Sequence, residues 1–471
     1  MRARSIVAVS VLAAGALAAS SAMTPVRDSD LYWQLALARD TLAHGLVRAD
    51  TYSWTARGAP VSTDQWLGQI VLYAGYLAAG WLGVLAVRVV GVAVLVFAIV
   101  AAALVRRPRR PLVAIAIALP AILLSRFEWT ERPELFGAVL FALVVLLLQL
   151  PGERPLVAIA ALLILWANVH GSFALGAGIV ALVALHGLAT DRALRRGYLV
   201  ALAGAAASCV LTPAGLGTLG APGFHLLQPP REIQEWAIPD PTTLAGAIWA
   251  LLLGLVLATA ALTRPARARD VILLVPLALL SLIAIRHTPL FAIAATPFLA
   301  DRSPAALRAA VAAPLGVRIA PPARGTAARA ADLALGIAGV ALLVGGIAAA
   351  PRSIDEGGFP VAALSRLPAG PGLFAQYDWG GWLIWNAPAT PVFVDGRLTP
   401  FLGPVMDDYR TVLEARPGWR DVLARRHVRW ILVRPRDPVA VRALDLGWSV
   451  LSRGPAYVLI QVSDSYQGGR P

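Results

Sequence analysis

Two aspartates, Asp28 and Asp30, stand one residue apart just after the first apolar stretch of the chain. They open a polar segment, 27–66, in a sequence that is otherwise strongly apolar. Two adjacent carboxylates near a low-dielectric surface are unfavourable unless they bind a proton or a cation, because burial penalises their charge. The pair is therefore a candidate general base or cation ligand, with a polar surface loop as the alternative.

Further polar groups interrupt the apolar sequence. One is the run 126–134, with three glutamates and two arginines; the others lie at 168–170, 212–242 and 286–287. Guanidinium groups bind phosphate, and carboxylates bind protons or divalent cations. The alternative is that some of these residues are arginine-paired helix ends or structural histidines. The residues in question are Arg126, Glu128, Glu131, Arg132, Glu134, Asn168, His170, Glu232, Glu235, Arg286 and His287.

The composition is that of a polytopic membrane protein. Of 471 residues, 58% are hydrophobic and 14% charged, and the mean hydropathy is +0.69, whereas about a quarter of the residues in soluble domains are charged. All 41 basic residues are arginines scattered over loops, as in a high-GC bacterial genome, so the net charge of +14 does not indicate a nucleic-acid partner. The single cysteine, Cys209, excludes an intramolecular disulfide and argues against a thiolate metal site.

Apolar windows of roughly 15 to 24 residues predict about eleven membrane-spanning helices. If the N-terminus is cytoplasmic, the inner segments carry eighteen arginines. The outer loops carry eight when Arg286, at the outer end of its span, is counted with them, so the bias follows the positive-inside rule. Segment 27–66 and the chain after residue 350 are then expected outside the membrane. The expected spans are 5–23, 82–105, 112–125, 133–150, 156–169, 172–189, 198–212, 243–263, 271–286, 288–300 and 332–350.

Three segments among these spans allow more than one interpretation. Residues 5–23 also fit a cleaved signal peptide, but we expect an uncleaved first span that holds the loop after it. Residues 67–81 fit an interfacial helix, because counting them as a span would place Arg106–Arg110 outside. Residues 168–171 predict a tight outer turn between two spans.

After residue 350 the sequence changes to mixed charge with many aromatic, proline and glycine residues, which predicts a separate domain at 351–471. Short β-type runs at 392–394, 430–433 and 457–462 alternate with helical patterns at 405–414 and 419–426, so this domain is expected to be α/β. Two motifs within it, Tyr377-Asp-Trp-Gly-Gly-Trp382 and Asp395-Gly-Arg397, are otherwise explained as a tight turn and a turn with a local ion pair.

This layout resembles the GT-C superfamily of lipid-phosphate-sugar-dependent glycosyltransferases, and within it the catalytic subunits of oligosaccharyltransferases. The resemblance is carried by four features in order: Asp28 and Asp30 in the first outer loop, Glu128 and Glu131 before the fourth span, Glu232 and Glu235 in a long outer loop, and Gln376-Tyr-Asp-Trp-Gly-Gly-Trp382 in the C-terminal domain. The stretch ending at Arg88 is similar to a run in protein O-mannosyltransferase-like members. The combination of these features with the motifs Asn-x-His-Gly-Ser and Val-Asp-Gly-Arg is also similar to a set of bacterial multi-pass proteins described as glycosyltransferases. The fold that this implies is an α-helical polytopic membrane domain, 1–350, with a small C-terminal extracytoplasmic α/β domain.

The resemblance implies transfer of a hexosyl or pentosyl group from a polyprenyl-phosphate-linked donor. In that chemistry Asp28 or Asp30 is the expected base, and Arg286, His287 and Arg126 are the expected partners of the donor phosphate. By analogy with the family, Asp30, Glu128 and Glu131 would hold a divalent cation, Mg or Mn. By the same analogy, the acceptor would meet Tyr377, Asp378, Trp379, Glu232 and Glu235. Because Gln-Tyr-Asp replaces the aromatic-aromatic-Asp of the family motif, the acceptor is left open among protein, glycan and lipid.

The expected function is therefore an extracytoplasmic glycosyltransferase of the bacterial plasma membrane, with the lipid bilayer and a polyprenyl-phosphate sugar as partners. The alternative is a non-catalytic transporter or assembly factor for cell-envelope glycans. A transporter is expected to place ionisable residues at mid-span along a path, whereas here the acids gather at one end of the spans. That distribution favours the enzyme.

Overall fold

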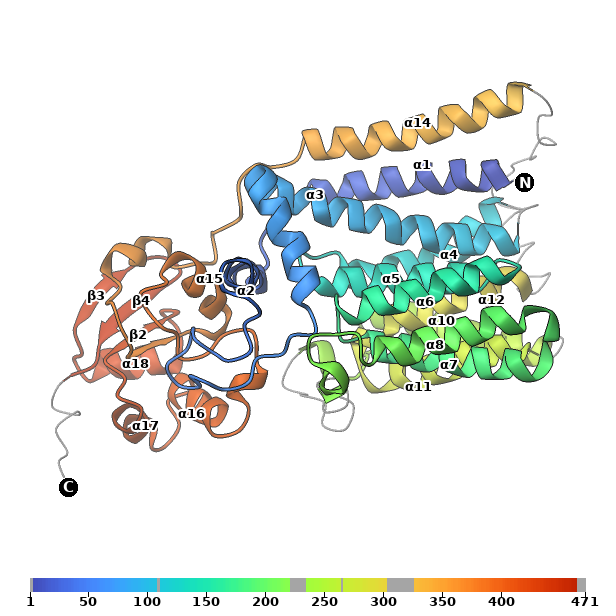
Figure 1. The fold of residues 1–471 in the computed structure, drawn as a ribbon. Helices are drawn as coiled ribbons and strands as arrows, with labels where there is room; N and C mark the ends of the chain where they lie inside the picture. Colours follow the sequence, from blue (N-terminus) through green and yellow to red (C-terminus); the bar gives the residue numbers. More distant parts are fainter. Residues whose placement is uncertain (1–2, 108–110, 221–233, 264–265, 303–325, 464–471) are drawn as a thin grey trace. The chain divides into compact units, whose positions relative to one another are not determined.

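The computed structural model describes residues 3–107, 111–220, 234–263, 266–302 and 326–463 (Figure 1). Its contacts divide the chain into two compact units. One, here called the helical unit, comprises Met1–Thr24 and Leu82–Pro351; the other, the mixed unit, comprises Pro25–Trp81 and Arg352–Pro471. The expected boundary near residue 350 coincides with a boundary between units, but the first loop groups with the C-terminal segment rather than with the apolar helices.

All eleven expected spans fall on helices, because each is a long apolar run with few residues that break a helix. Among the described residues, six helices are long and apolar enough to cross a membrane by length and composition: Arg4–Ala22, Trp66–Arg106, Pro111–Glu128, Phe173–Thr190, Leu244–Leu262 and Arg329–Ala348. The helices are α1 (Ala3–Ala22), α3 (Trp66–Arg106), α4 (Pro111–Ser125), α5 (Pro133–Leu147), α6 (Glu153–Ala167), α7 (Phe173–Thr190), α8 (Arg195–Ser208), α10 (Leu244–Leu262), α11 (Ala268–Ile283), α12 (Thr288–Arg302) and α14 (Thr326–Ala348). Short 3-10 turns join them: η1 (Arg126–Glu128), η2 (Arg192–Leu194), η3 (Gly215–Leu219), η4 (Gln234–Trp236) and η5 (Ile285–His287).

Helix α3 is interrupted where the two units meet in the sequence. Ala79, with φ −153°, and Gly80, with φ 59° and ψ −141°, leave the helical region, and glycine adopts such a conformation without steric penalty. Most of the segment 67–81 is thus helical, and the break near its end separates it from the apolar helix that follows. Its position in the membrane interface stays a prediction. The turn expected at 168–171 is present between α6 and α7.

Helices α1 and α14, from opposite ends of the helical unit's sequence, lie side by side (Figure 1). Glycines make this close approach possible. A Cβ atom on Gly15 would lie 1.9 Å from the Gly339 carbonyl oxygen, and one on Gly339 would lie 2.4 Å from the Val11 oxygen. Small residues allow apolar helices to pack backbone to backbone, where dispersion forces stabilise the pair.

We expect Gly15→Leu to lower the melting temperature of the detergent-purified protein, because the added side chain must force α1 and α14 apart. Overpacking of this kind costs about 1–3 kcal/mol. Gly345→Leu is the matched control, since a Cβ atom there meets nothing within 4 Å. Equal melting temperatures for the two variants in a thermal scan would show that the glycine contact does not stabilise the pair.

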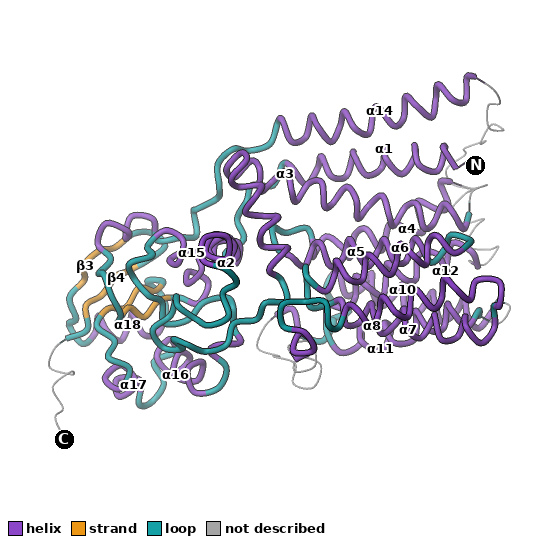
Figure 2. The backbone as a smooth tube through the Cα atoms, in the orientation of Figure 1, coloured by secondary structure: helices purple, strands orange, loops and turns teal. Residues whose placement is uncertain are grey.

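The mixed unit is built on a four-stranded sheet of order β1-β2-β4-β3. Figure 2 draws the strands in orange. Strand β1 (Leu373–Ala375) runs parallel to β2 (Trp430–Val433), whereas β4 (Val458–Gln461) is antiparallel to β2 and to β3 (Val450–Arg453). The strands expected at 430–433 and 457–462 are confirmed. The expected strand at 392–394 is wrong: this segment makes only an isolated bridge to Ser53 of the first loop.

Alternate residues of the strands face two separate hydrophobic cores, as the twofold period of a strand requires. One face is covered by α16 (Pro404–Leu413), α17 (Trp419–Arg425) and α18 (Pro438–Asp445), and the first two confirm the expected helices. The other face is covered by α15 (Tyr377–Asn386) and by α2 (Asp30–His44) of the first loop, which bury Trp379, Trp382 and Tyr32 against Leu432 and Leu459. The first loop is therefore an integral layer of the mixed unit. Turns η6 (Val361–Arg366) and η7 (Thr399–Phe401) complete it.

Candidate active site

Asp28 and Asp30 begin helix α2, and they have different roles there. Asp28 Oδ1 accepts a hydrogen bond from the Asp30 amide at 2.9 Å, so it binds one of the amides that a helix start leaves without a helical partner. Asp30 is the first helical residue, and its Oδ1 accepts a hydrogen bond from the Trp33 indole Nε1 at 3.1 Å. The structure thus gives Asp28 a capping role and fixes the orientation of the Asp30 carboxylate.

The motif Tyr377–Trp382 begins helix α15, so the alternative that it forms a tight turn is wrong. Its glycines are needed for space. A Cβ atom on Gly380 would lie 2.3 Å from the Val394 carbonyl oxygen, and one on Gly381 would lie 2.9 Å from the Ser29 oxygen. The two glycines therefore allow α15 to fit between the start of α2 and segment 394–395.

The three residues expected to contact an acceptor lie differently on α15. The Tyr377 side chain is half-buried; burial and then the neighbouring Asp30 carboxylate raise the pKa of Tyr377, so its phenol is neutral and can donate a hydrogen bond. Asp378 is exposed and pairs with Arg434 at 3.0 Å. Trp379 is buried in the core and donates its indole N–H to the Gly358 oxygen at 2.9 Å. Their contact with an acceptor stays a prediction.

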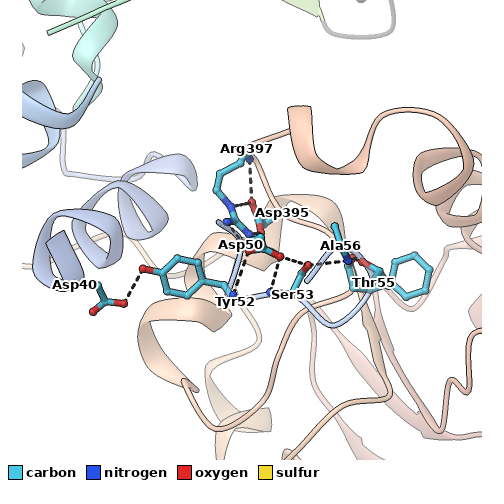
Figure 3. Close-up of polar contacts among 9 residues, drawn as sticks. Asp40, Asp50, Tyr52, Ser53, Thr55, Ala56, Asp395 and Arg397 are labelled. Atoms are coloured by element: carbon cyan, nitrogen blue, oxygen red, sulfur yellow. Dashed lines mark hydrogen bonds and ion pairs between the residues drawn. The ribbon is translucent and has the colours of Figure 1, made fainter. Parts of the chain in front are cut away.

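A buried ion cluster joins the first loop to the C-terminal segment of the mixed unit (Figure 3). Arg397 donates to both oxygens of Asp395, at 2.7 and 2.5 Å, and to Asp50 Oδ1 at 2.6 Å. Asp395 and Asp50 are 0% and 1% exposed, so both charges depend on this one guanidinium. Burial by itself lowers the pKa of Arg397, but the two carboxylates outweigh it and raise that pKa above its ordinary value. The local Asp395–Arg397 pair was expected; its third member was not.

The same segment of the first loop continues this network away from Arg397. The Asp50 carboxylate also accepts hydrogen bonds from the Tyr52 amide at 3.1 Å and from the Ser53 hydroxyl, and Tyr52 donates its own hydroxyl to Asp40 at 2.7 Å (Figure 3). Burial and the hydrogen bond to Asp40 raise the pKa of Tyr52, so the phenol stays protonated. These contacts link α2 to segment 50–53.

In the helical unit, two guanidinium groups share one carboxylate. Arg132 contacts Glu235 Oε1 at 3.3 Å, and Arg286 contacts Glu235 Oε2 at 3.8 Å. Arg286 also lies over the Trp236 ring, 4.7 Å from its centre. Guanidinium groups recognise carboxylate and phosphate with the same geometry, so a group of this kind can bind a phosphate in place of the carboxylate.

His287 and Arg126, the other expected partners of the donor phosphate, differ in charge and in exposure. Burial and the adjacent Arg286 lower the pKa of His287 to about 4, so its imidazole is neutral near pH 7 and can bind phosphate only by hydrogen bonding. Arg126 is exposed and lies over the Trp129 ring at 5.7 Å. Glu232, expected at the acceptor, lies outside the described residues. Glu235 belongs with Arg132 and Arg286 in the helical unit, whereas Tyr377 is in the mixed unit.

Glu131 forms a buried ion pair with Arg88 of α3, and both side chains are 3% exposed. Arg88 also donates to the carbonyl oxygens of Ser21 and Thr24, which stabilises the end of α1. The Glu128 carboxyl lies within electrostatic range of the Arg286 guanidinium and of the Glu134 and Glu235 carboxyl groups. Within the described ranges, no three His, Cys, Asp or Glu side chains meet in a way that can hold a metal ion.

The donor set thus fits the implied cation poorly. The Glu131 carboxylate is already neutralised by its buried ion pair with Arg88. Dependence on a divalent cation stays a prediction, which adding a chelator to the transfer reaction tests.

A second pair of ionisable groups lies at the turn between α6 and α7. His170 Nε2 is 3.8 Å from Glu134 Oε1, and His170 Nδ1 accepts from the Ser172 amide at 3.2 Å. Because Nδ1 accepts, the ring proton is on Nε2 and faces Glu134. The Ser172 hydroxyl in turn accepts the Trp166 indole N–H at 3.0 Å. The sequence motif Asn-x-His-Gly-Ser thus builds a hydrogen-bonded helix connection.

The supporting roles of Trp33, Asp50 and Arg88 appear only in the structure. Asp50 carried only a weak signal, an acid within an aromatic loop segment. Trp33 follows Asp30 by three residues, and in a helix this spacing places the two side chains on one face. Arg88 was noticed as part of a motif, but its partner Glu131 is 43 residues away and nothing local indicates the pairing.

Neither family models nor curated proteins match this sequence. Among solved structures, the archaeal oligosaccharyltransferase AglB from Archaeoglobus fulgidus, in complex with an inhibitory peptide and a dolichol-phosphate, is similar with a TM-score of 0.59 and 11% identity over 90% of this chain and 69% of that one. The same oligosaccharyltransferase tethered with an acceptor peptide gives a TM-score of 0.53 at 13% identity, covering 91% and 69%.

A further similar structure is ArnT from Cupriavidus metallidurans bound to undecaprenyl phosphate, with a TM-score of 0.50 and 16% identity over 98% of both chains. These likenesses extend over nearly the whole chain and include both units. They agree with the apolar helices of this chain. The protein is therefore a multi-pass membrane protein that shares its fold with these oligosaccharyltransferase and ArnT structures.

Proposed function

We propose that this protein is a glycosyltransferase that moves a sugar from a polyprenyl-phosphate-linked donor to an extracytoplasmic acceptor. The observation that carries the proposal is a fixed carboxylate, Asp30, at the start of α2 in a chain with the GT-C fold. AglB with dolichol-phosphate and ArnT with undecaprenyl phosphate support a polyprenyl-phosphate ligand. The sugar is a hexosyl or pentosyl group, and the acceptor is a glycan, lipid or protein.

Asp30 is the proposed base. Its carboxylate accepts the proton of the acceptor hydroxyl or amide while the acceptor atom forms a bond to the anomeric carbon of the sugar. The bond from that carbon to the phosphate oxygen breaks, and its electron pair leaves with the phosphate, so the configuration inverts. Asp28 also accepts one hydrogen bond, from the Asp30 amide at the start of α2, and the Asn variants of the two aspartates compare them directly.

Arg286 and Arg132 are the proposed partners of the donor phosphate. They neutralise its charge, and the phosphate exchanges with the Glu235 carboxylate that the two arginines now share. The Trp236 ring holds the Arg286 guanidinium from one side, which limits the side-chain entropy lost on binding. His287 adds a neutral hydrogen-bonding group. Arg126 stays a separate prediction.

The arginine excess of the inner segments supports a cytoplasmic N-terminus and a mixed unit outside the bacterial plasma membrane. The function is tested by supplying membranes with a panel of radiolabelled polyprenyl-phosphate sugars, with and without chelator, and following label in glycan, lipid and protein fractions. Transfer by the wild type supports the proposal. No product from any donor leaves the transporter or assembly factor as the better explanation.

Binding of the lipid phosphate is expected to change in opposite directions when the arginines and their resident carboxylate are altered. Arg286→Ala removes a charge-assisted contact worth about 1.5–3 kcal/mol and should weaken undecaprenyl-phosphate binding by about 10- to 100-fold. Glu235→Gln removes the competing anion and should tighten it. Native mass spectrometry of the purified protein with undecaprenyl phosphate measures both, and Arg329→Ala provides a control for net charge. Unchanged affinity in both variants would refute the site.

A further inference from the structure

Gly396 lies directly against the proposed base. A Cβ atom at this position would be 1.9 Å from Asp30 Oδ1 and 2.9 Å from Trp33 Nε1, the two atoms joined by the Asp30–Trp33 hydrogen bond. Contacts below 3.0 Å do not occur for real Cβ atoms, so any side chain here must displace the Asp30 carboxylate. The Asp30 carboxylate therefore occupies the volume that a side chain at residue 396 would need.

The need for glycine at 396 is steric and not conformational. Gly396 is absent from the glycines with positive φ, such as Gly403 at φ 82° and Gly418 at φ 83° in the same unit. An alanine can adopt the backbone conformation of residue 396, and only its methyl group would meet the carboxylate. Gly380 and Gly381 of α15 also leave no room for a side chain, because α15 packs closely against segment 394–395 and the start of α2.

The backbone around Gly396 is held in place on both sides. Before it, the Asp395 carboxylate is fixed by Arg397, which is itself bound to Asp50 of the first loop. After it, Leu398 has φ 52° and ψ −60°, and the Thr399 amide donates to the Arg397 oxygen at 2.5 Å. This is a strained γ-turn, which persists only where the surrounding structure enforces it. The segment cannot move away easily, so the Asp30 side chain would have to move.

The geometry points to Gly396 as a positioning residue for the proposed base. With no side chain of its own, it leaves room for the Asp30 carboxylate on the Trp33 indole, and the Arg397 ion cluster holds it there. The first loop supplies the base, and the C-terminal segment sets its orientation. This inference rests on the proposed function for its activity readout, but its contact can be tested without any activity.

Gly396→Ala is expected to lower kcat about 100-fold while KM stays within about threefold, because an error of about 1 Å in a reacting group has effects of this size. Gly358→Ala is the matched control: a Cβ atom there meets nothing within 4 Å, and wild-type rates are expected.

A double-mutant cycle distinguishes positioning from a general structural defect. In the Asp30→Asn background, Gly396→Ala should reduce the residual rate by less than about threefold, because the group that it displaces no longer acts as a base. Equal fold-losses in both backgrounds, or a wild-type rate for Gly396→Ala, would overturn the inference.

The contact itself is tested by thermal unfolding. Gly396→Ala should lower the melting temperature by about 2–4 °C in the wild-type background and by less than half of that with Asp30→Ala, which removes the carboxylate. If Gly396→Ala does not fold, restored folding of the double variant supports the inference, and continued misfolding overturns it. Should wild-type membranes transfer no sugar, the proposed function fails, and this cycle alone decides whether Gly396 positions Asp30.

Discussion

Asp30→Asn is expected to reduce sugar transfer by about 10²- to 10⁴-fold, the range in which a general base contributes. The amide has the same shape and can still accept the Trp33 indole hydrogen bond, so the start of α2 should remain intact. What the variant lacks is a group that can take the proton of the acceptor. The measurement is the initial rate of label transfer at saturating donor, with expression matched by immunoblot.

Asp28→Asn decides between the two aspartates. Its amide oxygen can still accept the Asp30 N–H, so the capping role of Asp28 should survive and the rate should fall far less than in Asp30→Asn. Asp64→Asn, whose carboxylate accepts from the nearby Ser62 hydroxyl at 2.5 Å, is a control for loss of charge in the same loop. A larger loss in Asp28→Asn than in Asp30→Asn would reverse the assignment of the base.

Arg397→Ala is expected to destabilise the mixed unit by about 3–5 kcal/mol, because it leaves buried carboxylates without their counter-ion. Asp395 and Asp50 are both almost fully buried, and each relies on this guanidinium. The effect should be local to the junction between first loop and C-terminal segment. Hydrogen exchange followed by mass spectrometry should therefore show faster exchange in peptides that cover 49–60 and 392–401.

Arg416→Ala is the comparison for this change. Arg416 pairs with Glu414 at 2.8 Å, but both side chains are 50% exposed, and such surface pairs contribute about 0–1 kcal/mol. Its exchange pattern should match that of the wild type. If Arg397→Ala also exchanges like the wild type, the ion cluster holds neither the first loop nor the backbone at Gly396 in place.

The sequence predicted those parts of the fold that depend on local pattern. Apolar runs identified all eleven helical segments of the expected spans, and the period of the C-terminal sequence identified α16, α17, β2 and β4. Segment 392–394 shows where this reasoning fails. Its apolar β-type residues are buried by packing on the first loop and not by pairing within the sheet, which no local pattern reveals.

The candidate residues were identified by type, but their partners were not. Asp28 and Asp30 look equivalent in the sequence, and only the hydrogen bonds at the start of α2 separate a cap from a fixed carboxylate. Glu131 looked like a cation ligand, whereas the structure pairs it with Arg88.

The sequence by itself determined that this is a multi-pass helical membrane protein with a small α/β portion, because hydropathy and periodicity act over short stretches. Only the tertiary structure decided that the first loop and the C-terminal segment share one core, with Gly396 against Asp30 and Arg397 against Asp50. These contacts join residues about 350 positions apart, and they depend on burial and on steric fit between side chain and backbone. Neither burial nor steric fit can be read from the order of residues along the chain.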